Sequence, residues 1–506
     1  MSIDIFAPAH VLARRVAQGE ANAEAVTEAF LGRIATLNPR LAAFTDITAA
    51  RAREQARSID KDRGAGRPLG PLAGAPFAAK NLFDIAGLPT RAGSMINRER
   101  APATRDAVLV ERLSAAGAVL LGGLNMGEYA YDFTGENAHD GACRNPHDPA
   151  RMSGGSSSGS GSATAAGLSP ITLGSDTNGS IRVPASLCGI FGLKPTYGRL
   201  PRTRSFPFCD SLDHLGPLAR DVTDLALAYD LMQGPDAGDP ACAQRTAEPT
   251  VLRLRDGIGG LRIGVAGGYF ATDGMPEARA AVAQVAGALG AKRIIDIDGV
   301  PIARAAAFLI TNAESSSFHL PRLRSRADDF DPETRDRFLA GALLPAGWYV
   351  QAQRARRWFH EEMMRHFAEV DLIVAPATPC VAPLIGQKSL EVRGETLPLR
   401  PSLGLFTQPI SCVGLPVAAV PVQGAGLPIG VQLIAPPWRE DLCLKAAFAL
   451  QTMGVCRAAD PALLPGLRHA GGSDDAAARP RPGTHANPVD RLTDPRAGWT
   501  SGSDNR

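Results

Sequence analysis

Residues 153–200 read SGGSSSGSGSATAAGLSPITLGSDTNGSIRVPASLCGIFGLKPTYGRL. The stretch begins with a Gly/Ser run, continues through an Ala-rich piece that favours a helix, and reaches a short apolar strand candidate at Ile171–Leu173. Gly/Ser runs are typical of flexible linkers, but this one leads at once into segments that need a core. Glycine lets backbone N–H groups approach a ligand closely, and hydroxyls beside such groups are what acyl transfer requires. The stretch therefore predicts a nucleophile and an oxyanion hole held between core segments.

The same stretch resembles the signature of the amidase signature family of serine hydrolases. The matched positions keep one register and are Gly154-Gly155-Ser156-Ser157, Gly174-Ser175-Asp176-Thr177, Gly179-Ser180-Ile181-Arg182, Pro184-Ala185, Cys188-Gly189, Gly192 and Lys194-Pro195-Thr196. Two departures are Ser158 and Asn178, where the family usually has glycine. Both side chains are small and polar and are compatible with the fold, and Asn178 stands where it would tune an oxyanion hole.

The resemblance implies a Ser–Ser–Lys triad. Ser180 would be the nucleophile, Ser156 the bridging serine on a cis Gly155–Ser156 bond, and Lys80 the base. The resemblance also implies an oxyanion hole from backbone N–H groups and a pair of charged residues that braces the loop; these are Thr177, Asn178, Gly179 and Ser180 for the hole, and Asp176 and Arg182 for the brace.

Lys80 is also a candidate on its own surroundings. The four residues before it, Pro-Phe-Ala-Ala at 76–79, predict a buried strand. Burial disfavours the ammonium form, so a lysine at this place loses its charge more easily than an exposed one. The residues alone also fit a surface lysine at a strand end, and the family pattern favours the base.

Composition excludes several classes of protein. The 506 residues carry 53 basic and 51 acidic side chains, a net charge of +2, without a basic block, so nucleic-acid binding is not implied. The eight cysteines are scattered without a CxxC pair, which predicts buried thiols in a reducing compartment and no metal site. We see no signal-peptide pattern or membrane-spanning apolar window, and we expect a cytoplasmic protein without a cofactor.

Alternating strand and helix patterns predict an α/β fold. Residues 8–60 look helical, and Ala23–Leu37 has one apolar face at helical spacing. Strand candidates recur at Phe77–Ile85, at 118–122 and at Ile171–Leu173. With the resemblance, we expect a single amidase-signature domain over residues 1–470, with a central mixed sheet covered by helices on both faces. Residues 471–506 have few apolar side chains and predict a disordered tail.

Three other patterns could suggest a different chemistry. His214 could be mistaken for a catalytic histidine, but we interpret it as a hydrogen-bonded structural residue. His360 and His366 are six residues apart, which places them on different helix faces and argues against a metal pair. The GxSxG match centred on Ser157 would be a nucleophile elbow, but an Asn-Pro-His-Asp-Pro segment at 145–149 precedes it where a strand is required.

Resemblance to two subfamilies bears on the substrate. In the glutaminase subunit of glutamyl-tRNA amidotransferase, an aspartate is expected to hold the glutamine ammonium, and the matching position here is Gly404. Several stretches are closer to the catalytic subunit of 1-carboxybiuret hydrolase, from cyanuric acid breakdown. Such a substrate carries a carboxylate, which arginine binds bidentately. Arg337 is our candidate for that contact and Tyr131 for the acyl pocket; a solvated helix arginine and an ordinary polar loop are the alternatives.

The expected activity is thus hydrolysis of an amide or ureide C–N bond in a small molecule, with release of ammonia. The alternatives are a general aliphatic or aryl amidase and a glutamyl-tRNA amidotransferase A-type subunit. A non-catalytic scaffold subunit would be favoured by loss of a triad residue, and all three are present. Both subfamilies pair the large subunit with a small helical one, so the resemblance implies an accessory subunit, and we expect an oligomer.

Overall fold

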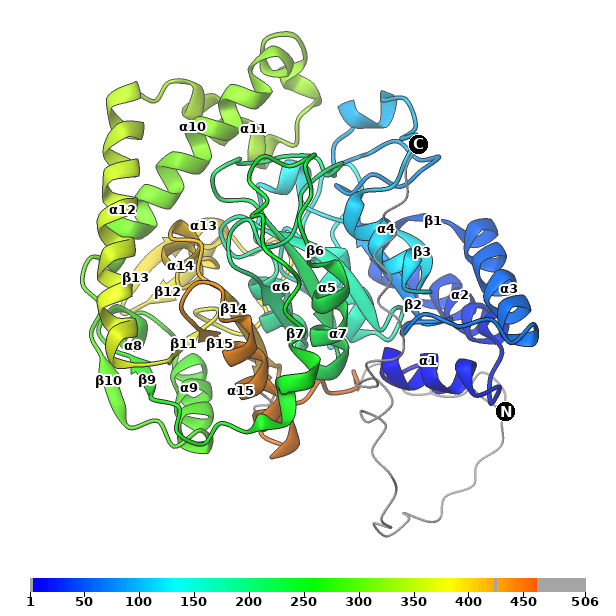
Figure 1. The fold of residues 1–506 in the computed structure, drawn as a ribbon. Helices are drawn as coiled ribbons and strands as arrows, with labels where there is room; N and C mark the ends of the chain where they lie inside the picture. Colours follow the sequence, from blue (N-terminus) through cyan, green and yellow to red (C-terminus); the bar gives the residue numbers. More distant parts are fainter. Residues whose placement is uncertain (1–2, 423–425, 462–506) are drawn as a thin grey trace.

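The computed structural model describes residues 3–422 and 426–461; the tail predicted at 471–506 lies outside these residues. Eleven strands form one sheet that is shared by segments from residue 44 to residue 434 (Figure 1). In spatial order they are β1 (Phe44–Ile47), β3 (Val119–Leu124), β2 (Pro76–Lys80), β6 (Ile171–Asp176), β8 (His214–Ala219), β7 (Phe191–Lys194), β14 (Val417–Val422), β15 (Ile429–Ile434), β11 (Leu372–Pro376), β9 (Ile263–Ala266) and β10 (Arg293–Ile295).

The sheet is mixed, as predicted. Strand β2 runs parallel to both β3 and β6, and β9 runs parallel to both β10 and β11, whereas the central strands from β6 to β11 pair antiparallel. The strands near the centre are rich in apolar residues and are buried along their whole length. Such burial is typical of strands covered on both faces.

Helices cover both faces, which confirms the predicted fold class. On β14, Ala419 packs in a cluster with Ile181 and Ala185 of the segment around α6 (Arg182–Cys188). Its neighbours Ala418 and Val420 belong to the main core, which includes the apolar side of α15 (Glu440–Thr452). Because successive strand residues point to opposite faces, α6 and α15 lie on opposite sides of the sheet.

The Gly/Ser run forms most of a helix, α5 (Ser158–Ala165), every residue of which is buried. Our sequence interpretation placed only the later Ala-rich piece in a helix. Close packing explains the composition. A Cβ on Gly159 would lie 2.3 Å from the carbonyl oxygen of Ala43, and one on Gly161 would lie 2.9 Å from Pro184. The small residues therefore allow backbones to approach, so the run is a packing device and not a linker.

The prediction that residues 8–60 are wholly helical was wrong at one place. Helices α1 (Ala9–Ala17), α2 (Ala23–Leu41) and α3 (Ala49–Gly64) are interrupted by strand β1, which pairs with β3 at the edge of the sheet. A four-residue strand has too little periodicity to stand out between two helices, and its pairing with the distant strand β3 decides its conformation.

The remaining helices frame the sheet. They are α4 (Val108–Ala115), α7 (Val222–Met232), α8 (Tyr269–Thr272), α9 (Pro276–Ala288), α10 (Val300–Arg326), α11 (Pro332–Ala342), α12 (Ala346–Glu369), α13 (Leu399–Ser402) and α14 (Gln408–Cys412). Helix α10 packs against α11, α12 and α14, and these elements lie together at one end of the molecule in Figure 1. Within the described residues, we find no helix that combines the length and apolarity needed to cross a membrane.

Candidate active site

Lys80 is the last residue of β2, and its amine is surrounded by three hydroxyl groups. Lys80 Nζ lies 2.7 Å from Ser156 Oγ, 2.8 Å from Ser175 Oγ and 3.1 Å from Ser157 Oγ. The lysine side chain is fully buried. Ser175 lies beside Lys80 because it belongs to β6, the parallel neighbour of β2. Ser156 and Ser157 come just before the start of α5.

The hydroxyl group of Ser157 cannot donate a hydrogen bond to the Lys80 amine. Ser157 Oγ accepts from the backbone N–H of Ser175 at 3.2 Å and donates to the carbonyl oxygen of Ser175 at 3.1 Å. The hydroxyl proton of Ser157 is thus committed, so Ser157 accepts from Lys80, while Ser156 is free to donate to a neutral amine. Burial lowers the pKa of Lys80 to about 7, against the opposing influence of the Asp213 and Asp176 carboxylates.

The Gly155–Ser156 peptide bond is cis, as the family resemblance implies. The backbone on either side is tied to neighbouring segments: the N–H of Gly155 donates to the carbonyl of Phe133 at 2.8 Å, and the N–H of Ser157 donates to the carbonyl of Ser180 at 3.3 Å. The second bond joins the Ser156–Ser157 segment directly to the loop that carries the predicted nucleophile.

The loop between β6 and α6 is braced by a buried ion pair. Asp176 and Arg182 are both fully buried, with Nε of the arginine 2.9 Å from the carboxylate. Burial by itself would raise the pKa of the Asp176 carboxyl, but the Arg182 guanidinium holds that pKa well below its ordinary value. The remaining guanidinium donors reach Gln432 Oε1 at 2.7 Å, the carbonyl of Thr407 at 3.2 Å and Ser411 Oγ. The pair therefore fastens the loop to α14 and β15.

The tip of this loop leaves backbone donors unused. Among the described residues, the N–H groups of Asn178, Gly179 and Ser180 donate no hydrogen bond to a protein acceptor. Gly179 has a φ of +143°, and a Cβ there would lie 2.2 Å from Thr407 Oγ1, so only glycine fits. Buried, unused N–H groups beside a hydroxyl are the arrangement that stabilises an oxyanion in acyl transfer.

Side chains hold the loop tip in place from two directions. Thr177 Oγ1 donates to the Asp213 carboxylate at 2.6 Å, and Asn178 Nδ2 donates to Thr311 Oγ1 of α10 at 2.8 Å. Asn178 therefore uses its amide for anchoring, where a glycine would leave Thr311 without this partner.

A small cavity of about 10 Å³ lies at Ser180. We name it the inner cavity; its lining is Ala130, Tyr131, Asp132, Phe133, Thr177, Asn178, Ser180, Phe208, Phe308, Thr311, Arg337 and Gln408. The structure thus brings together Ser180, the loop tip and the two predicted substrate-binding residues. The Arg337 guanidinium lies over the Tyr131 ring, 3.9 Å from its centroid, and donates to the Tyr131 carbonyl at 2.8 Å. The Asp132 carboxylate forms an ion pair with Arg400 at 2.5 Å.

Buried polar contacts position helix α11, which carries Arg337. Glu128 is fully buried and accepts from the N–H of Asp331 at 2.7 Å and from Thr334 Oγ1 at 2.9 Å, both near the start of α11. Its other oxygen contacts His139 at 3.1 Å, and this contact is the largest cause of the raised pKa of His139.

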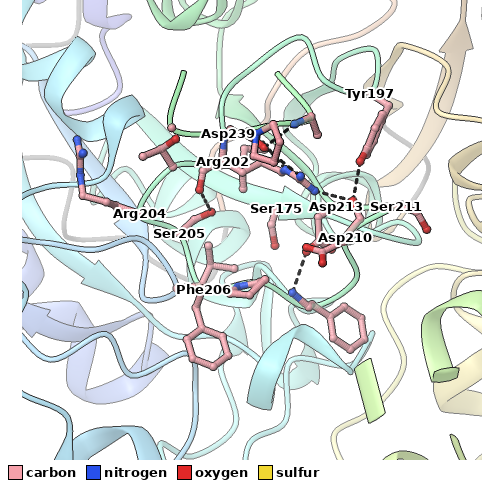
Figure 2. A pocket seen from close by; sticks show the side chains of 18 residues that line it. Ser175, Tyr197, Arg202, Arg204, Ser205, Phe206, Asp210, Ser211, Asp213 and Asp239 are labelled. Atoms are coloured by element: carbon pink, nitrogen blue, oxygen red, sulfur yellow. Dashed lines mark hydrogen bonds and ion pairs between the residues drawn. The ribbon is translucent and has the colours of Figure 1, made fainter. Parts of the chain in front are cut away.

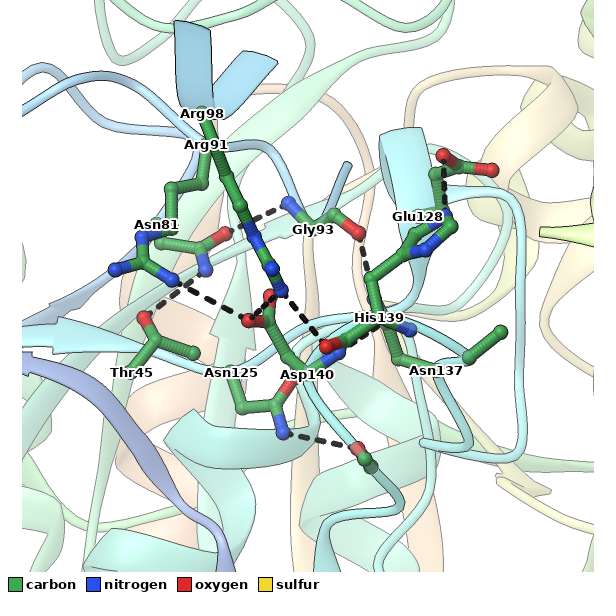
Figure 3. Close-up of polar contacts among 12 residues, drawn as sticks. Thr45, Asn81, Arg91, Gly93, Arg98, Asn125, Glu128, Asn137, His139 and Asp140 are labelled. Carbon is green, nitrogen blue, oxygen red and sulfur yellow. Dashed lines mark hydrogen bonds and ion pairs between the residues drawn. The ribbon is translucent and has the colours of Figure 1, made fainter. Parts of the chain in front are cut away.

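Figure 3 shows that this contact belongs to a network which extends to Asn81, the residue after Lys80. Asn81 Oδ1 accepts from the N–H of Gly93 at 3.0 Å, and Asn137 Nδ2 donates to the Gly93 carbonyl at 2.7 Å. One polar network therefore supports both the lysine and the arginine of the candidate site.

A second and much larger cavity, of about 590 Å³, approaches Lys80 from another side. We name it the loop cavity, because residues of the segments 197–215, which include Asp213, and 238–241 line most of it; Leu82 and Ser175 complete its lining (Figure 2). Its two arginines are neutralised: Arg202 pairs with Asp239 at 3.1 Å, and Arg204 pairs with Glu111 at 2.6 Å. Phe208 lines both this cavity and the inner cavity.

The other candidates take part in hydrogen bonds that hold the fold together. His214 is buried, and its Nδ1 lies 2.6 Å from the Leu212 carbonyl, which confirms the prediction of a hydrogen-bonded structural residue. Ser157 is buried and its hydroxyl is fully used, which argues against a nucleophile elbow there. Among the described residues, the one cluster with metal-ligand spacing is His10, Asp221 and Asp224, but Asp224 already accepts the N–H groups of Ala9 and His10 at the start of α1.

Sequence reasoning missed three side chains of the site. Ser175 was within the quoted signature but was not connected with Lys80, and Asp213, which precedes the His214 considered above, was given no role. Thr311 had no signal at all, because it lies in α10, 133 residues beyond the Asn178 that it contacts. Of the three, only Ser175 belongs to the matched motif, where a search for further polar residues near the triad could have found it.

Comparisons with known proteins agree with this geometry. The amidase family model matches residues 25–444. AtzE of Pseudomonas sp. (strain ADP), described as a subunit of 1-carboxybiuret hydrolase, is 54% identical over 445 residues, which are 87% of this chain and 97% of that protein. The A-type subunit of the glutamyl-tRNA(Gln) amidotransferase of Roseiflexus sp. (strain RS-1) is 39% identical over 463 residues, 86% of this chain and 93% of that protein.

One solved structure is similar over nearly the whole fold. It is described as "An unexpected vestigial protein complex reveals the evolutionary origins of an s-triazine catabolic enzyme", has 53% sequence identity and a TM-score of 0.89, and the match covers 90% of this chain and all of that one. The motif register, the fold and these matches together establish that this chain belongs to the amidase family, whose members are hydrolases that act on C–N bonds.

Proposed function

We propose that the protein hydrolyses a carboxylated ureide, 1-carboxybiuret or a close relative, through an acyl-enzyme on Ser180, with Ser156 as proton relay and Lys80 as base. The observation that carries the catalytic part is the fully buried Lys80 amine within 2.7 Å of the Ser156 hydroxyl. A neutral amine in this place is the base that a serine nucleophile needs.

In the proposed reaction, neutral Lys80 accepts the Ser156 proton while Ser156 accepts the Ser180 proton. Ser180 Oγ forms a bond to the carbonyl carbon, and the carbonyl electrons move to oxygen. The tetrahedral species collapses with cleavage of the C–N bond, and the leaving nitrogen takes the proton back from Lys80 through Ser156 and departs as ammonia. A water molecule then attacks the acyl carbon by the same proton route, which releases the acid and restores Ser180.

The oxyanion of each tetrahedral species would be stabilised by the unused N–H groups at the loop tip. Removing one donor of this kind costs on the order of 3 kcal/mol of transition-state stabilisation in serine hydrolases. The Asp176–Arg182 pair would act indirectly, because it holds the loop and neither residue belongs to the lining of the inner cavity.

Two observations support a carboxylated substrate. The first is the 54% identity to a protein named as part of 1-carboxybiuret hydrolase, over 97% of that protein's length. The second is Arg337, which lines the inner cavity and has no carboxylate within ion-pair distance among the described residues. A buried or half-buried guanidinium without an acidic partner is suited to a carboxylate ligand.

The same cavity disfavours glutamine as the substrate. A Cβ on Gly404 would lie 2.6 Å from the Phe133 ring, so a side chain at this position could not enter the cavity as Phe133 now stands. Because residue 404 is glycine, the carboxylate that would hold a glutamine ammonium is missing, and the position of Phe133 leaves no room for one. Asp132, which does line the cavity, is already paired with Arg400.

We also propose that the protein works with a partner subunit. The 54% identical relative is named as a subunit, and the 53% identical solved structure is described as a protein complex. A small helical partner and an oligomeric assembly remain the expectation for this chain, which size-exclusion chromatography of the co-expressed pair would test.

The decisive experiment measures ammonia release from a panel of substrates by the purified protein, with Ser180→Ala as control. The panel contains 1-carboxybiuret generated in situ, biuret, allophanate, glutamine and a simple aryl amide. We expect turnover of 1-carboxybiuret that is abolished in the control. Turnover of aryl or aliphatic amides alone would make the protein a general amidase and would refute the carboxylated substrate. If the isolated chain turns over no substrate, the same panel is run with the co-expressed partner.

A further inference from the structure

A third cavity adjoins the inner cavity. This outer cavity has a volume of about 460 Å³ and is lined by Tyr269, Pro301, Arg304, Ala305, Phe308, Leu309, Pro401 and Gln408. Phe308 and Gln408 line both the inner and the outer cavity. Since the inner cavity has room for about one water molecule, a substrate that enters from the outer cavity must displace side chains at this boundary to reach Ser180.

Helix α10 connects the two cavities along one face. Arg304, Phe308 and Thr311 follow one another at i, i+4 and i+7, so they lie on one side of the helix. Arg304 lines the outer cavity, Phe308 lies at the boundary, and Thr311 contacts Asn178 beside Ser180. Seven residues of helix span about 10 Å, so Arg304 stands about two helical turns from the residue that anchors the loop of Ser180.

Arg304 contacts Gln408, one of the two side chains that line both cavities. Its Nε donates to Gln408 Oε1 at 2.9 Å, and its Nη2 donates to the Pro401 carbonyl at 3.2 Å. These two bonds leave further N–H donors of the guanidinium for an anion, which would then bind beside Gln408.

The wall of the outer cavity carries a positive charge at Arg304. No carboxylate lies within ion-pair distance of Arg304 among the described residues, and the outer cavity has no acidic side chain in its lining. The Asp273 carboxylate, which contributes to the raised pKa of Tyr269 in this wall, is itself paired with Arg393 at 2.9 Å. In contrast, the arginines of the loop cavity are both paired.

We propose that Arg304 and Gln408 form an entrance that selects anionic substrates: Arg304 binds the incoming carboxylate in the outer cavity, and the carboxylate then passes to Arg337 beside Ser180. This inference rests on the proposed function, because it assigns a second specificity residue to the same carboxylated substrate. Arg304 acts at the encounter stage and Arg337 in the bound complex, since the two residues line successive cavities of the route.

The test compares the wild type with Arg304→Gln. We expect kcat/KM for 1-carboxybiuret to fall about tenfold, mainly through KM, because a charge at the rim of a site acts on association. Its dependence on salt should weaken, since exposed charges are screened over about 10 Å at 0.1 M salt. As a probe of binding alone, the preference for malonate over neutral malonamide as inhibitors should also fall about tenfold.

Two further variants keep the test decisive. Arg304→Lys keeps the charge and should keep most of the salt dependence and of the malonate preference. Arg324→Gln removes an exposed arginine of the same helix, 20 residues or about 30 Å further along, and should change neither measurement. Equal effects of Arg304→Gln and Arg324→Gln would show that only net charge matters and would overturn the entrance.

Failure of this inference is distinguishable from failure of the proposed function. Wild-type turnover of neutral amides alone refutes the carboxylated substrate, and the inference with it, before any variant is made. Turnover of 1-carboxybiuret with an unchanged rate, salt dependence and malonate preference in folded Arg304→Gln overturns the entrance and leaves the substrate standing.

Discussion

The inner cavity and the loop cavity approach the Lys80 cluster from two sides and differ in both size and chemistry. The loop cavity is about 590 Å³ and reaches Ser175, whereas the inner cavity is about 10 Å³ and contains Ser180. Size alone would favour the loop cavity as the substrate site. The chemistry favours the inner cavity, because it holds the hydroxyl beside unused backbone donors.

The difference teaches that unsatisfied groups identify this site better than volume does. In the loop cavity, Arg202 and Arg204 are neutralised by acidic partners and Asp213 is occupied by Thr177 and by backbone N–H groups. In the inner cavity, the Arg337 guanidinium has no carboxylate partner among the described residues. Groups that the fold has left without partners are free to bind a substrate, and those already paired are part of the structure.

The largest expected effect is a difference in kcat between variants of two serines that contact Lys80. Ser156→Ala should lower kcat by about 10³-fold or more, because it removes the proposed proton relay. Ser175→Ala removes a hydrogen bond of similar length from the loop-cavity side and should lower kcat by less than about tenfold. Steady-state ammonia release from both variants checks the comparison. Equal losses would show that Ser175 is as important as Ser156 and would contradict the relay assigned to Ser156 alone, and a larger loss in Ser175→Ala would reverse the assignment.

The second effect is the pH dependence of kcat/KM. The amine must be neutral to accept a proton, and burial lowers the pKa of Lys80 to about 7, so the rate should be constant above this pH and fall about tenfold per unit below it. At pH 5 the expected loss is about 100-fold. A pH–rate profile on a substrate without titrating groups measures this limb. A limb at an ordinary lysine pKa, near about 10.4, would show that Lys80 is charged at neutral pH.

Lys194 provides the internal reference for that prediction. It is also fully buried, and burial lowers its pKa to about 7 as well, but its amine donates to the backbone carbonyls of Pro195 and Leu415. Carbonyl oxygens cannot give a proton to an amine, so Lys194 cannot act as a base for a serine. A low pKa alone therefore does not assign a catalytic role; the hydroxyl groups around Lys80 do.

A third effect compares arginines from the two cavities. Arg337→Gln should lower kcat/KM for 1-carboxybiuret about 30-fold, which corresponds to about 2 kcal/mol for a charged hydrogen bond to a carboxylate. Arg202→Gln makes the same change in the loop cavity, where the side chain is already paired with Asp239, and should alter kcat/KM less than about threefold. Parallel kinetics of both variants decide between them. A larger loss in the Arg202 variant would move the substrate carboxylate into the loop cavity.

The smallest expected effect concerns the loop tip. Asn178→Gly restores the residue usual in the family and removes the hydrogen bond to Thr311. A net loss of about 1 kcal/mol, or about fivefold in kcat, is expected because the backbone donors remain while their anchoring is weaker. Thr311→Val should reproduce this loss without changing the loop sequence. If Asn178→Gly were slow and Thr311→Val unaffected, the Asn178 side chain would act on the substrate itself and not through α10.

The sequence by itself determined the family, the fold class and the residues of the proposed triad. This was possible because the signature combines short local requirements: glycines where backbones approach, as at Gly159 and Gly179, and hydroxyls at set spacings from them. The apolar run before Lys80 likewise indicated its burial, because such a run is best accommodated inside the sheet. Each of these features depends on residues close together in the chain.

The tertiary structure alone decided what surrounds the triad. Strand β1 exists because of its pairing with β3, and Ser175 contacts Lys80 because β6 is the parallel neighbour of β2. The Arg304–Gln408 contact joins residues 104 positions apart, and the Arg337–Tyr131 contact joins residues 206 positions apart. Such pairs carry no local pattern, since the order of strands and the packing of α10 against α14 create them. The physical reason is that substrate selection depends on groups left unpaired by the whole fold, and pairing is known only when the fold is complete.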